Sequence, residues 1–344
     1  MPSLNHVMSN ESAAPAEPDF RRLGATLSRP ESVLAHASGL LFCSDWQGPG
    51  GVAVVTPDGA VRRLAIRSLP GLRPNGIALE AGGSFLVAHL GSDTGGLYRL
   101  HPDGSVDPVL TELDGTPLPP SNFPIVDAAG RIWLTVSTTR VPRAADYRPG
   151  ADTGFIVVMD EAGARIAASG LGYTNELAFS ADGRFAYVNE TFGRRVTRFR
   201  VTDDAALVEP TLIASLPAGD FPDGLVLDVE GGLWITSIVS NRIIRIAPDG
   251  TRTVFAEESD PDHLAWVEAA YCDGTMGRPH LDAVPTTMFR NISSLAFGGP
   301  GLRTGFLGCL LGDALVAFEA PVAGLRPTHY DVDIGPLLKT LDLQ

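Results

Sequence analysis

Short hydrophobic segments alternate with turn residues along most of the chain. The segments have four to seven residues rich in Val, Ile, Leu and Phe, such as VAVV (52–55), RIWLTVS (131–137), FAYVNE (185–190) and LWITSI (233–238). They are too short and too rich in β-branched residues to be helices. Pro-Asp-Gly and related turn sequences occur between them at residues 56–59, 101–104, 180–183 and 247–250. The pattern predicts an all-β chain, with helical periodicity only near 261–271.

The hydrophobic segments belong to a repeated unit that carries a turn glycine. The repeat glycines are Gly39, Gly83, Gly130, Gly183, Gly231 and Gly301. Their spacings of 44, 47, 53, 48 and 70 residues define six units of about 50 residues, each with room for four short strands. This predicts a six-bladed β-propeller over residues 22–344, with two stacked sandwiches as the alternative. The long last spacing locates a lid-like insertion at about 257–288, and residues 1–21 are expected to be a disordered tail.

An oxygen-bearing residue lies eight positions before each of the first five repeat glycines. These residues are Glu31, Asn75, Asn122, Asn175 and Asp223, and the sixth unit offers Ser293 or Ser294. Because the first strand of each blade lines the central channel of a propeller, a constant offset predicts a ring of side chains around the axis. Asn and Asp are also common turn residues before strands, but the same offset in five units favours a site.

Two carboxylates and several amide oxygens at one point repel each other unless a cation lies between them. A hard divalent cation accepts such ligands. Calcium tolerates irregular geometry and neutral amides best, magnesium requires stricter octahedral order, and zinc normally recruits His or Cys. The sequence therefore predicts one divalent cation in the channel.

The composition limits the classes of partner that the protein is expected to bind. Lys+Arg 26 against Asp+Glu 40 gives a formal charge of −14, which argues against nucleic acid or an anionic membrane as a partner. No segment reaches the roughly 18 apolar residues of a membrane span. The three cysteines form no CxxC pair, and the first 20 residues lack the pattern of a secretory signal. We expect a cytoplasmic protein with a small-molecule substrate, its oligomeric state left open.

Three segments resemble the senescence-marker-protein/gluconolactonase/luciferin-regenerating-enzyme family of six-bladed propellers. They are SNFPIVDAAGRIWLT (121–135), YTNELAFSADGRFAYV (173–188) and FPDGLVLDVEGGLWIT (221–236), and the resemblance extends over about residues 23–320. It implies one divalent cation, usually Ca²⁺ with Zn²⁺, Mn²⁺ or Mg²⁺ as other candidates. By matching positions the ligands are Glu31, Asn122, Asn175 and Asp223, and Asn75 belongs to the pocket wall.

The resemblance also implies hydrolysis of a lactone or similar cyclic ester. A bound cation with open positions polarises an ester carbonyl and stabilises the developing oxyanion. Asp223 is the candidate general base for the attacking water, and direct attack by Asp223 is the alternative. Two other functions stay open. One is different chemistry on the same metal site, such as organophosphate hydrolysis or a lyase or isomerase step, and the other is a non-catalytic ligand-binding propeller.

The chain departs from the family at positions that bear on the substrate. Sugar-lactone hydrolases of the family carry Arg and Lys where this chain has Pro120 and Ile125, so we expect a less polar substrate than a simple sugar lactone. Glu176 stands where Gly is usual and is expected near the substrate, with Asn75. The insertion contains Trp266 and Tyr271, which would contact substrate if it acts as a lid. The alternative is a surface helix that packs on the blades.

Overall fold

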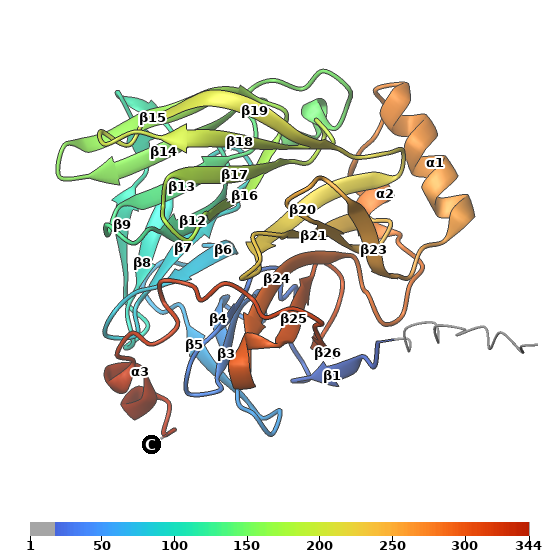
Figure 1. Ribbon diagram of the computed structural model, residues 1–344. Coiled ribbons are helices and arrows are strands. Elements are labelled where there is room, and N and C mark those ends of the chain that lie inside the picture. Colours follow the sequence, from blue (N-terminus) through green and yellow to red (C-terminus); the bar gives the residue numbers. More distant parts are fainter. Residues whose placement is uncertain (1–17, 344) are drawn as a thin grey trace, which may run out of the picture.

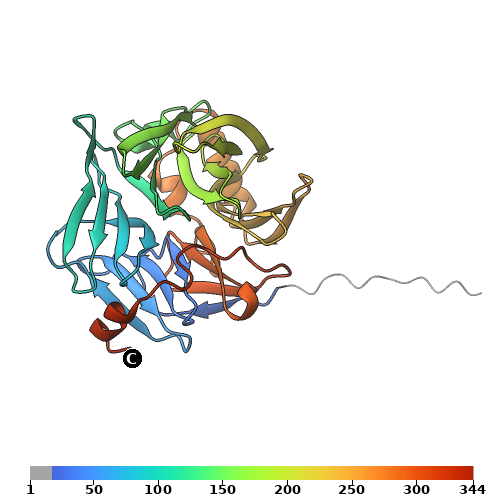
Figure 2. The same cartoon turned by 60° about the vertical axis from the view of Figure 1, so that its left-hand side comes forward.

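Six four-stranded antiparallel sheets surround a common axis in the computed structural model, which describes residues 18–343 (Figures 1 and 2). The innermost strands of neighbouring sheets pack against one another around this axis. The six-bladed β-propeller predicted from the repeats is therefore confirmed.

The first three blades follow the chain in order from the axis outwards. Blade 1 contains β2 (Val33–Ala35), β3 (Leu41–Asp45), β4 (Gly51–Val55) and β5 (Val61–Ala65). Blade 2 contains β6 (Pro74–Leu79), β7 (Phe85–His89), β8 (Leu97–Leu100) and β9 (Val106–Leu110). A small hairpin of β10 (Glu112–Leu113) and β11 (Thr116–Pro117) leads to blade 3. Blade 3 contains β12 (Ser121–Val126), β13 (Ile132–Val136), β14 (Gly154–Asp160) and β15 (Gly163–Leu171), with a 3₁₀ turn η1 (Arg143–Asp146) before β14.

The last three blades complete the circle. Blade 4 contains β16 (Thr174–Phe179), β17 (Phe185–Glu190), β18 (Arg195–Val201) and β19 (Leu207–Ser215). Blade 5 contains β20 (Asp220–Leu227), β21 (Leu233–Val239), β22 (Arg242–Ile246) and β23 (Arg252–Glu257). Blade 6 contains β24 (Ile292–Gly298), β25 (Thr304–Cys309), β26 (Leu315–Glu319) and, as its outer strand, β1 (Arg21–Leu23). A 3₁₀ turn η2 (Pro300–Leu302) precedes β25.

The N-terminal strand closes the propeller. β1 pairs antiparallel with β26, with Arg21 opposite Ala317 and Leu23 opposite Leu315. Just before it, the Phe20 ring packs edge-on against Phe289 at 4.8 Å. The expectation of disorder is therefore wrong for Phe20 and Arg21, and residues 1–17 of the predicted tail lie outside the described part of the chain.

The repeat glycines were recognised correctly as turn residues. All six have a left-handed backbone, with φ from 64° at Gly301 to 83° at Gly39. A side chain is disfavoured in that conformation, whereas glycine adopts it freely. The glycine therefore recurs because every blade needs the same tight turn between its first and second strands.

Two of the repeats contain an Asp three residues before the turn glycine and a Trp three residues after it. In blade 5 the Asp228 carboxylate accepts hydrogen bonds from the backbone N–H of Gly232 (2.8 Å), from Trp234 Nε1 (2.9 Å) and from Arg245 Nε (2.8 Å). Asp127 binds Trp133 in the same way in blade 3. Each fully buried indole packs against the next blade, so this carboxylate fixes a turn and an interface between blades at once.

The insertion between blades 5 and 6 is helical. It contains α1 (Pro261–Cys272) and α2 (Arg278–Asp282), and Asp260 caps α1 by accepting from the His263 N–H at 2.7 Å. In Figure 1 these helices lie on the opposite side of the propeller from α3 (Gly335–Thr340). Among the described residues there is no helix with the length and apolar character needed to cross a membrane.

The C-terminal segment runs across the face of the propeller where the inner strands end. Leu325 N–H donates to Leu227 O in blade 5, Thr328 Oγ1 donates to Val126 O in blade 3, and Ala37 N–H of blade 1 donates to Tyr330 O. α3 then buries Leu337 in the core shared by blades 1 and 2. We call residues 325–334 the C-terminal strap, because they connect blades that are far apart around the ring.

The carboxylate at the end of β20 can be tested by substitution. Asp228→Ala leaves the buried indole N–H of Trp234 and two backbone N–H groups without their acceptor, and it leaves Arg245 without its buried partner. We expect the free energy of unfolding to fall by about 3 kcal/mol in urea titrations. Asp249→Ala removes an exposed turn carboxylate that accepts from the Thr251 N–H, and it should change stability by less than about 1 kcal/mol. Equal effects of the two substitutions would contradict this role for Asp228.

Candidate functional site

The side chains predicted to form a ring meet at one mouth of the channel, where the inner strands begin. Each is buried, with exposed fractions from 2% for Asn75 to 9% for Glu31. Neighbouring blades are connected through them: Asn75 Nδ2 donates to Asn122 Oδ1 at 3.0 Å, and Ser293 Oγ donates to the Glu31 carbonyl at 3.0 Å. The structure thus brings together the residues selected by the constant offset, whereas their role as metal ligands stays a prediction.

The backbone around the ring is packed too closely for side chains at some positions. A Cβ atom at Gly76 would lie 2.7 Å from the Asn122 carbonyl oxygen, and one at Gly224 would lie 2.6 Å from the Ser294 Cα. Asn189 Nδ2 also donates to the carbonyl oxygens of Asp223 (3.0 Å) and Gly224 (2.9 Å). The Asn-Gly and Asp-Gly pairs of the repeats therefore let inner strands approach and hold the ring residue in place.

The two amides predicted to bind metal are oriented by their own blades. Asn122 Nδ2 donates to Ser137 Oγ at 2.8 Å, and Asn175 Nδ2 donates to Thr191 Oγ1 at 3.0 Å. Each acceptor follows the second strand of the same blade. With the nitrogens held there, the carbonyl oxygens are the atoms left to face the channel.

The two ring carboxylates lie close enough to affect each other. Burial, and then the negative charge of Glu31, raise the pKa of Asp223 well above its usual range, although Arg29, Arg143 and a hydrogen bond from Asn175 lower it. Asn75 Oδ1 is buried and has no hydrogen-bond partner among residues 18–343, and the buried Glu31 Oε2 has only Arg29 Nη2 beside it, at 2.6 Å. A buried oxygen without a donor, beside two like charges, fits a cation.

The donor set also explains which metals suit the mouth. In the part of the chain that the structure describes, no group of three or more His, Cys, Asp or Glu side chains is placed to hold a metal ion. The predicted set contains two carboxylates, and its other members are amides. Such a set suits calcium better than zinc.

Two arginines at the same mouth were not predicted. Arg29 Nη2 lies 2.6 Å from Glu31 Oε2, and its guanidinium lies over the Trp46 ring at 4.8 Å from the centroid. Arg143, at the start of η1, donates from Nε to Tyr173 Oη at 2.7 Å. Both are close enough to Asp223 to lower its pKa. One signal could have indicated Arg143: the Gly130–Gly183 spacing of 53 residues exceeds those of the first, second and fourth intervals, and its extra residues form the loop that carries Arg143.

The backbone at this mouth is unusual. Arg29 and Tyr173 have φ values of 53° and 70°, in the left-handed region that non-glycine residues seldom adopt. Each lies two residues before a ring residue, Glu31 or Asn175. Such conformations cluster at functional sites, where surrounding contacts hold them in place.

The helical insertion packs on the blades through Tyr271. Its ring is buried, and its hydroxyl donates to the Phe192 carbonyl at 2.6 Å. The ring joins an aromatic cluster on blades 3 to 5 that includes Tyr147, Tyr173, Phe192 and Phe221. Its hydroxyl and its faces are thus used in packing, and the expected contact of Tyr271 with substrate stays a prediction.

Trp266 lies on the outer side of the same insertion. It is 45% exposed and stacks on His280 with ring centroids 4.1 Å apart. Its indole covers α2 here, so the structure does not bring it to the ring of oxygen ligands, and the expected contact with substrate stays a prediction.

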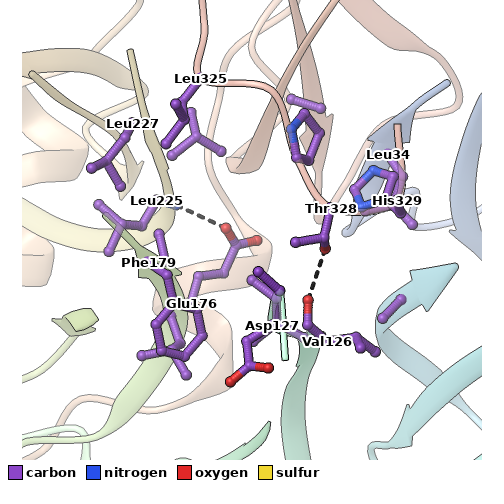
Figure 3. A pocket seen from close by; sticks show the side chains of 18 of the residues that line it. Leu34, Val126, Asp127, Glu176, Phe179, Leu225, Leu227, Leu325, Thr328 and His329 are labelled. Carbon is purple, nitrogen blue, oxygen red and sulfur yellow. Dashed lines mark hydrogen bonds between the residues drawn. The ribbon is translucent and has the colours of Figure 1, made fainter. Parts of the chain in front are cut away.

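Glu176 lies in the channel beyond the ring rather than at the ligand mouth. Its Oε2 accepts a hydrogen bond from the Leu225 N–H at 2.8 Å, and burial raises the pKa of its carboxyl well above the usual range. Figure 3 shows it on the wall of a cavity of about 470 Å³ between the inner strands and the C-terminal strap. The bulge at the start of β16 turns Glu176 towards the other end of the channel, and its expected contact with substrate stays a prediction.

The cavity around Glu176 is mostly apolar. Its walls include Leu34, Ile77, Ile125, Phe179 and Leu227 from five blades, and the strap covers it with Thr328 and His329 (Figure 3). Ile125, one of the two positions that depart from the sugar-lactone hydrolases, faces this cavity.

Comparison with known proteins agrees with the fold and shows the family. Residues 29–257 match the model of the SMP-30/gluconolactonase/LRE-like region, and the chain belongs to this family. It is 34% identical to an L-arabinolactonase of Azospirillum brasilense over 91 residues, 26% of this chain and 30% of that protein. It is 29% identical to a 6-deoxy-6-sulfogluconolactonase of Pseudomonas putida over 196 residues, 56% of this chain and 62% of that protein. The chain therefore spans less than two thirds of the length of either relative.

Solved structures agree on the fold. A gluconolactonase of Xanthomonas campestris superposes with a TM-score of 0.64 and 22% identity, over 88% of this chain and 90% of that one. At this identity the likeness concerns the fold and leaves the activity to be argued from the site.

The strap over the cavity should make stability depend on pH through His329. Burial, with a contribution from the neighbouring His36, lowers the pKa of His329 to about 4. The unfolded chain, with a histidine pKa of about 6.5, then takes up a proton that the folded protein does not, so stability falls as the pH falls from about 6.5 to 4. His329→Gln should remove this part of the acid loss, which is no more than about 3 kcal/mol at pH 4.

Urea unfolding of wild type and His329→Gln between pH 4 and 8 measures the effect. Above pH 7 the two stability profiles should run parallel, because His329 is neutral in both states there. Parallel profiles all the way down to pH 4 would show that the imidazole titrates in the folded protein as it does in the unfolded chain.

Proposed function

We propose that this protein is a metal-dependent, calcium-type hydrolase that opens a lactone or similar cyclic ester. The observation that carries the proposal is the meeting of Glu31, Asn122, Asn175 and Asp223 at one mouth of the channel, in a chain of this family. Two relatives named as lactonases, for L-arabinolactone and 6-deoxy-6-sulfogluconolactone, support the same reaction type.

The residues at the mouth fit a divalent cation, as the buried Asn75 oxygen without a donor indicates. Glu31 and Asp223 would supply charge, and Asn122 and Asn175 would supply carbonyl oxygens. When bound, such an ion polarises the ester carbonyl and stabilises the negative charge that develops on its oxygen. Four protein ligands leave positions for substrate, whereas a purely structural calcium site would favour six to eight oxygens.

The proton transfers of the reaction are carried out by side chains at the mouth. Asp223 accepts a proton from the water that attacks the lactone carbonyl, the ring C–O bond breaks, and the proton is returned to the ring oxygen as it leaves. The product is an open hydroxy acid. Asn75, held by its bond to Asn122, lies on the same ring and contacts the substrate from blade 2. Burial of all these groups excludes bulk water from the reacting carbonyl.

The part of the substrate that faces positions 120 and 125 is less polar than a simple sugar lactone, with fewer hydroxyl groups. Pro120 is buried, and Ile125 faces the apolar cavity, so neither position can bind sugar hydroxyls at the mouth. Besides the ring residues, the polar groups that reach the mouth are the guanidinium groups at positions 29 and 143.

Chelation and one substitution test the proposal. We expect protein treated with EDTA to lose hydrolysis of aliphatic and sugar lactones, followed by acid release, and Ca²⁺ to restore it better than Mg²⁺, Mn²⁺ or Zn²⁺. Asp223→Asn should lower kcat by about 10²-fold or more, because it removes the proton acceptor and one ligand charge. Calorimetry should show weaker Ca²⁺ binding by Asp223→Asn and Glu31→Gln.

Asp249→Asn, on an exposed turn, is the matched control and should keep wild-type kcat and Ca²⁺ affinity. Full activity after chelation, together with an active Asp223→Asn variant, would refute this site. Tight Ca²⁺ binding without turnover of lactones, aryl esters or phosphotriesters would instead identify a ligand-binding propeller.

A further inference from the structure

We propose that the substrate of this site carries an anionic group, a carboxylate or sulfonate, and that Arg143 binds it with help from Arg29. The inference rests on the proposed function, because it specifies the substrate class of the same mouth. It is independent of the identity of the metal.

Arg143 has a side-chain N–H donor without an acceptor among the described residues. Its Nε is held by Tyr173 Oη at 2.7 Å, and the guanidinium lies 5.6 Å from the centroid of the Tyr173 ring. Its Nη1 is buried and without a hydrogen-bond partner within residues 18–343. In the same described range, no carboxylate oxygen lies within 4.0 Å of an Arg143 guanidinium nitrogen, which is the distance limit for an ion pair. A guanidinium that is fixed on one edge and has a buried, unsatisfied nitrogen on another is costly unless a ligand supplies an acceptor.

The surroundings keep Arg143 charged and directed to the ring. Burial would lower the pKa of its guanidinium, but Tyr173, Tyr147 and Glu31 together raise it above the usual value. Tyr173 is two residues before the ring residue Asn175, so the hydroxyl that orients Arg143 is tied to the start of β16. Tyr147 packs edge-on against Tyr173, with ring centroids 5.4 Å apart, and fixes that ring in turn.

Arg29 adds a second positive charge from the segment that leads into blade 1, two blades away from Arg143. It contacts Glu31 through Nη2 at 2.6 Å, while its buried Nε lacks a partner among the described residues. Trp46 supports its guanidinium at 4.8 Å, and the Trp46 indole is itself anchored by donating to the Pro74 carbonyl at 2.6 Å. Arg29 is therefore positioned by an aromatic face rather than by flexible surface contacts.

The charge balance favours an anion over a neutral ligand. Glu31 and Asp223 together carry two negative charges, and Arg29 and Arg143 carry two positive ones. A divalent cation bound by the carboxylates would leave the two guanidinium charges uncompensated at the mouth. The chain as a whole has a formal charge of −14, so an anionic substrate needs a local positive site to approach.

A pair of matched ligands tests the inference without turnover. Tetrahydrofuran-2-carboxylate and tetrahydrofuran-2-carboxamide have the same ring and differ in charge, and neither contains an ester. Calorimetry with the calcium-loaded full chain should show the carboxylate binding at least about tenfold more tightly than the amide. The preference should weaken as salt is raised.

Substitutions identify the residue that is responsible for the preference for the carboxylate over the amide. Arg143→Met should abolish it, and Arg143→Lys should retain part of it, because Lys keeps the charge without the planar fork. Arg140→Met, three residues earlier on the same loop and exposed, is the matched control and should keep the full preference. If Arg143→Met does not fold, Tyr173→Phe removes the hydroxyl that orients Arg143 and should reduce the preference while keeping the ring packed.

Kinetics on the corresponding lactones separates this inference from the proposed function. 5-Oxotetrahydrofuran-2-carboxylate should have a lower KM than its amide, and Arg143→Met should raise the KM of the carboxylate selectively. Equal binding of both ligands, or a preference that survives Arg143→Met, overturns the inference even if both lactones are hydrolysed. A carboxylate preference without hydrolysis of either lactone would refute the hydrolase and leave the anion site standing.

Discussion

Closure of the circle is the constraint on which the rest of this structure depends. Six sheets around an axis leave one seam, and here β1 from the beginning of the chain completes the blade built by its end. Only when the seam is closed do all six inner strands lie side by side, with their first residues at one mouth. Glu31 and Asp223 are almost two hundred positions apart in sequence, and they affect each other because the ring is complete. The chemistry at the mouth is thus a consequence of a strand pairing some distance from it.

Much of the fold and of the ring could be predicted from the sequence because the blades need the same local contacts. The turn glycines recur since every blade needs a left-handed residue at one turn, and the Asp and Trp of two repeats recur since one carboxylate binds both the turn and the indole. Residues at the same offset from the turn glycine therefore occupy the same position in each blade. That is why counting along the chain selected Glu31, Asn75, Asn122, Asn175 and Asp223, which the structure brings to one mouth.

What the repeats could not predict comes from residues outside them. Arg143 reaches the mouth from a loop between the second and third strands of blade 3, and its position depends on Tyr173 of another blade. Glu176 follows a ring residue directly, yet a bulge in β16 turns it into the channel and away from the mouth. The sequence suggested that Tyr271 was free to contact substrate, but its hydroxyl donates a hydrogen bond to a carbonyl oxygen of blade 4. Phe20 was assigned to the predicted tail for a similar reason, since the residues that hold it, Phe289 and Phe318, lie near the other end of the sequence.

The two ends of the chain have a mechanical consequence. β1 lies against β26 through only three paired residues, whereas the strap and α3 are attached to blades 5, 3, 1 and 2 in succession. A force that pulls on the N-terminus would peel one short strand from blade 6. A force on the C-terminus would have to detach contacts on four blades in turn. The chain is therefore weakest where it begins, and stretching should open it at the seam first while the last residues still hold the blades around the cavity.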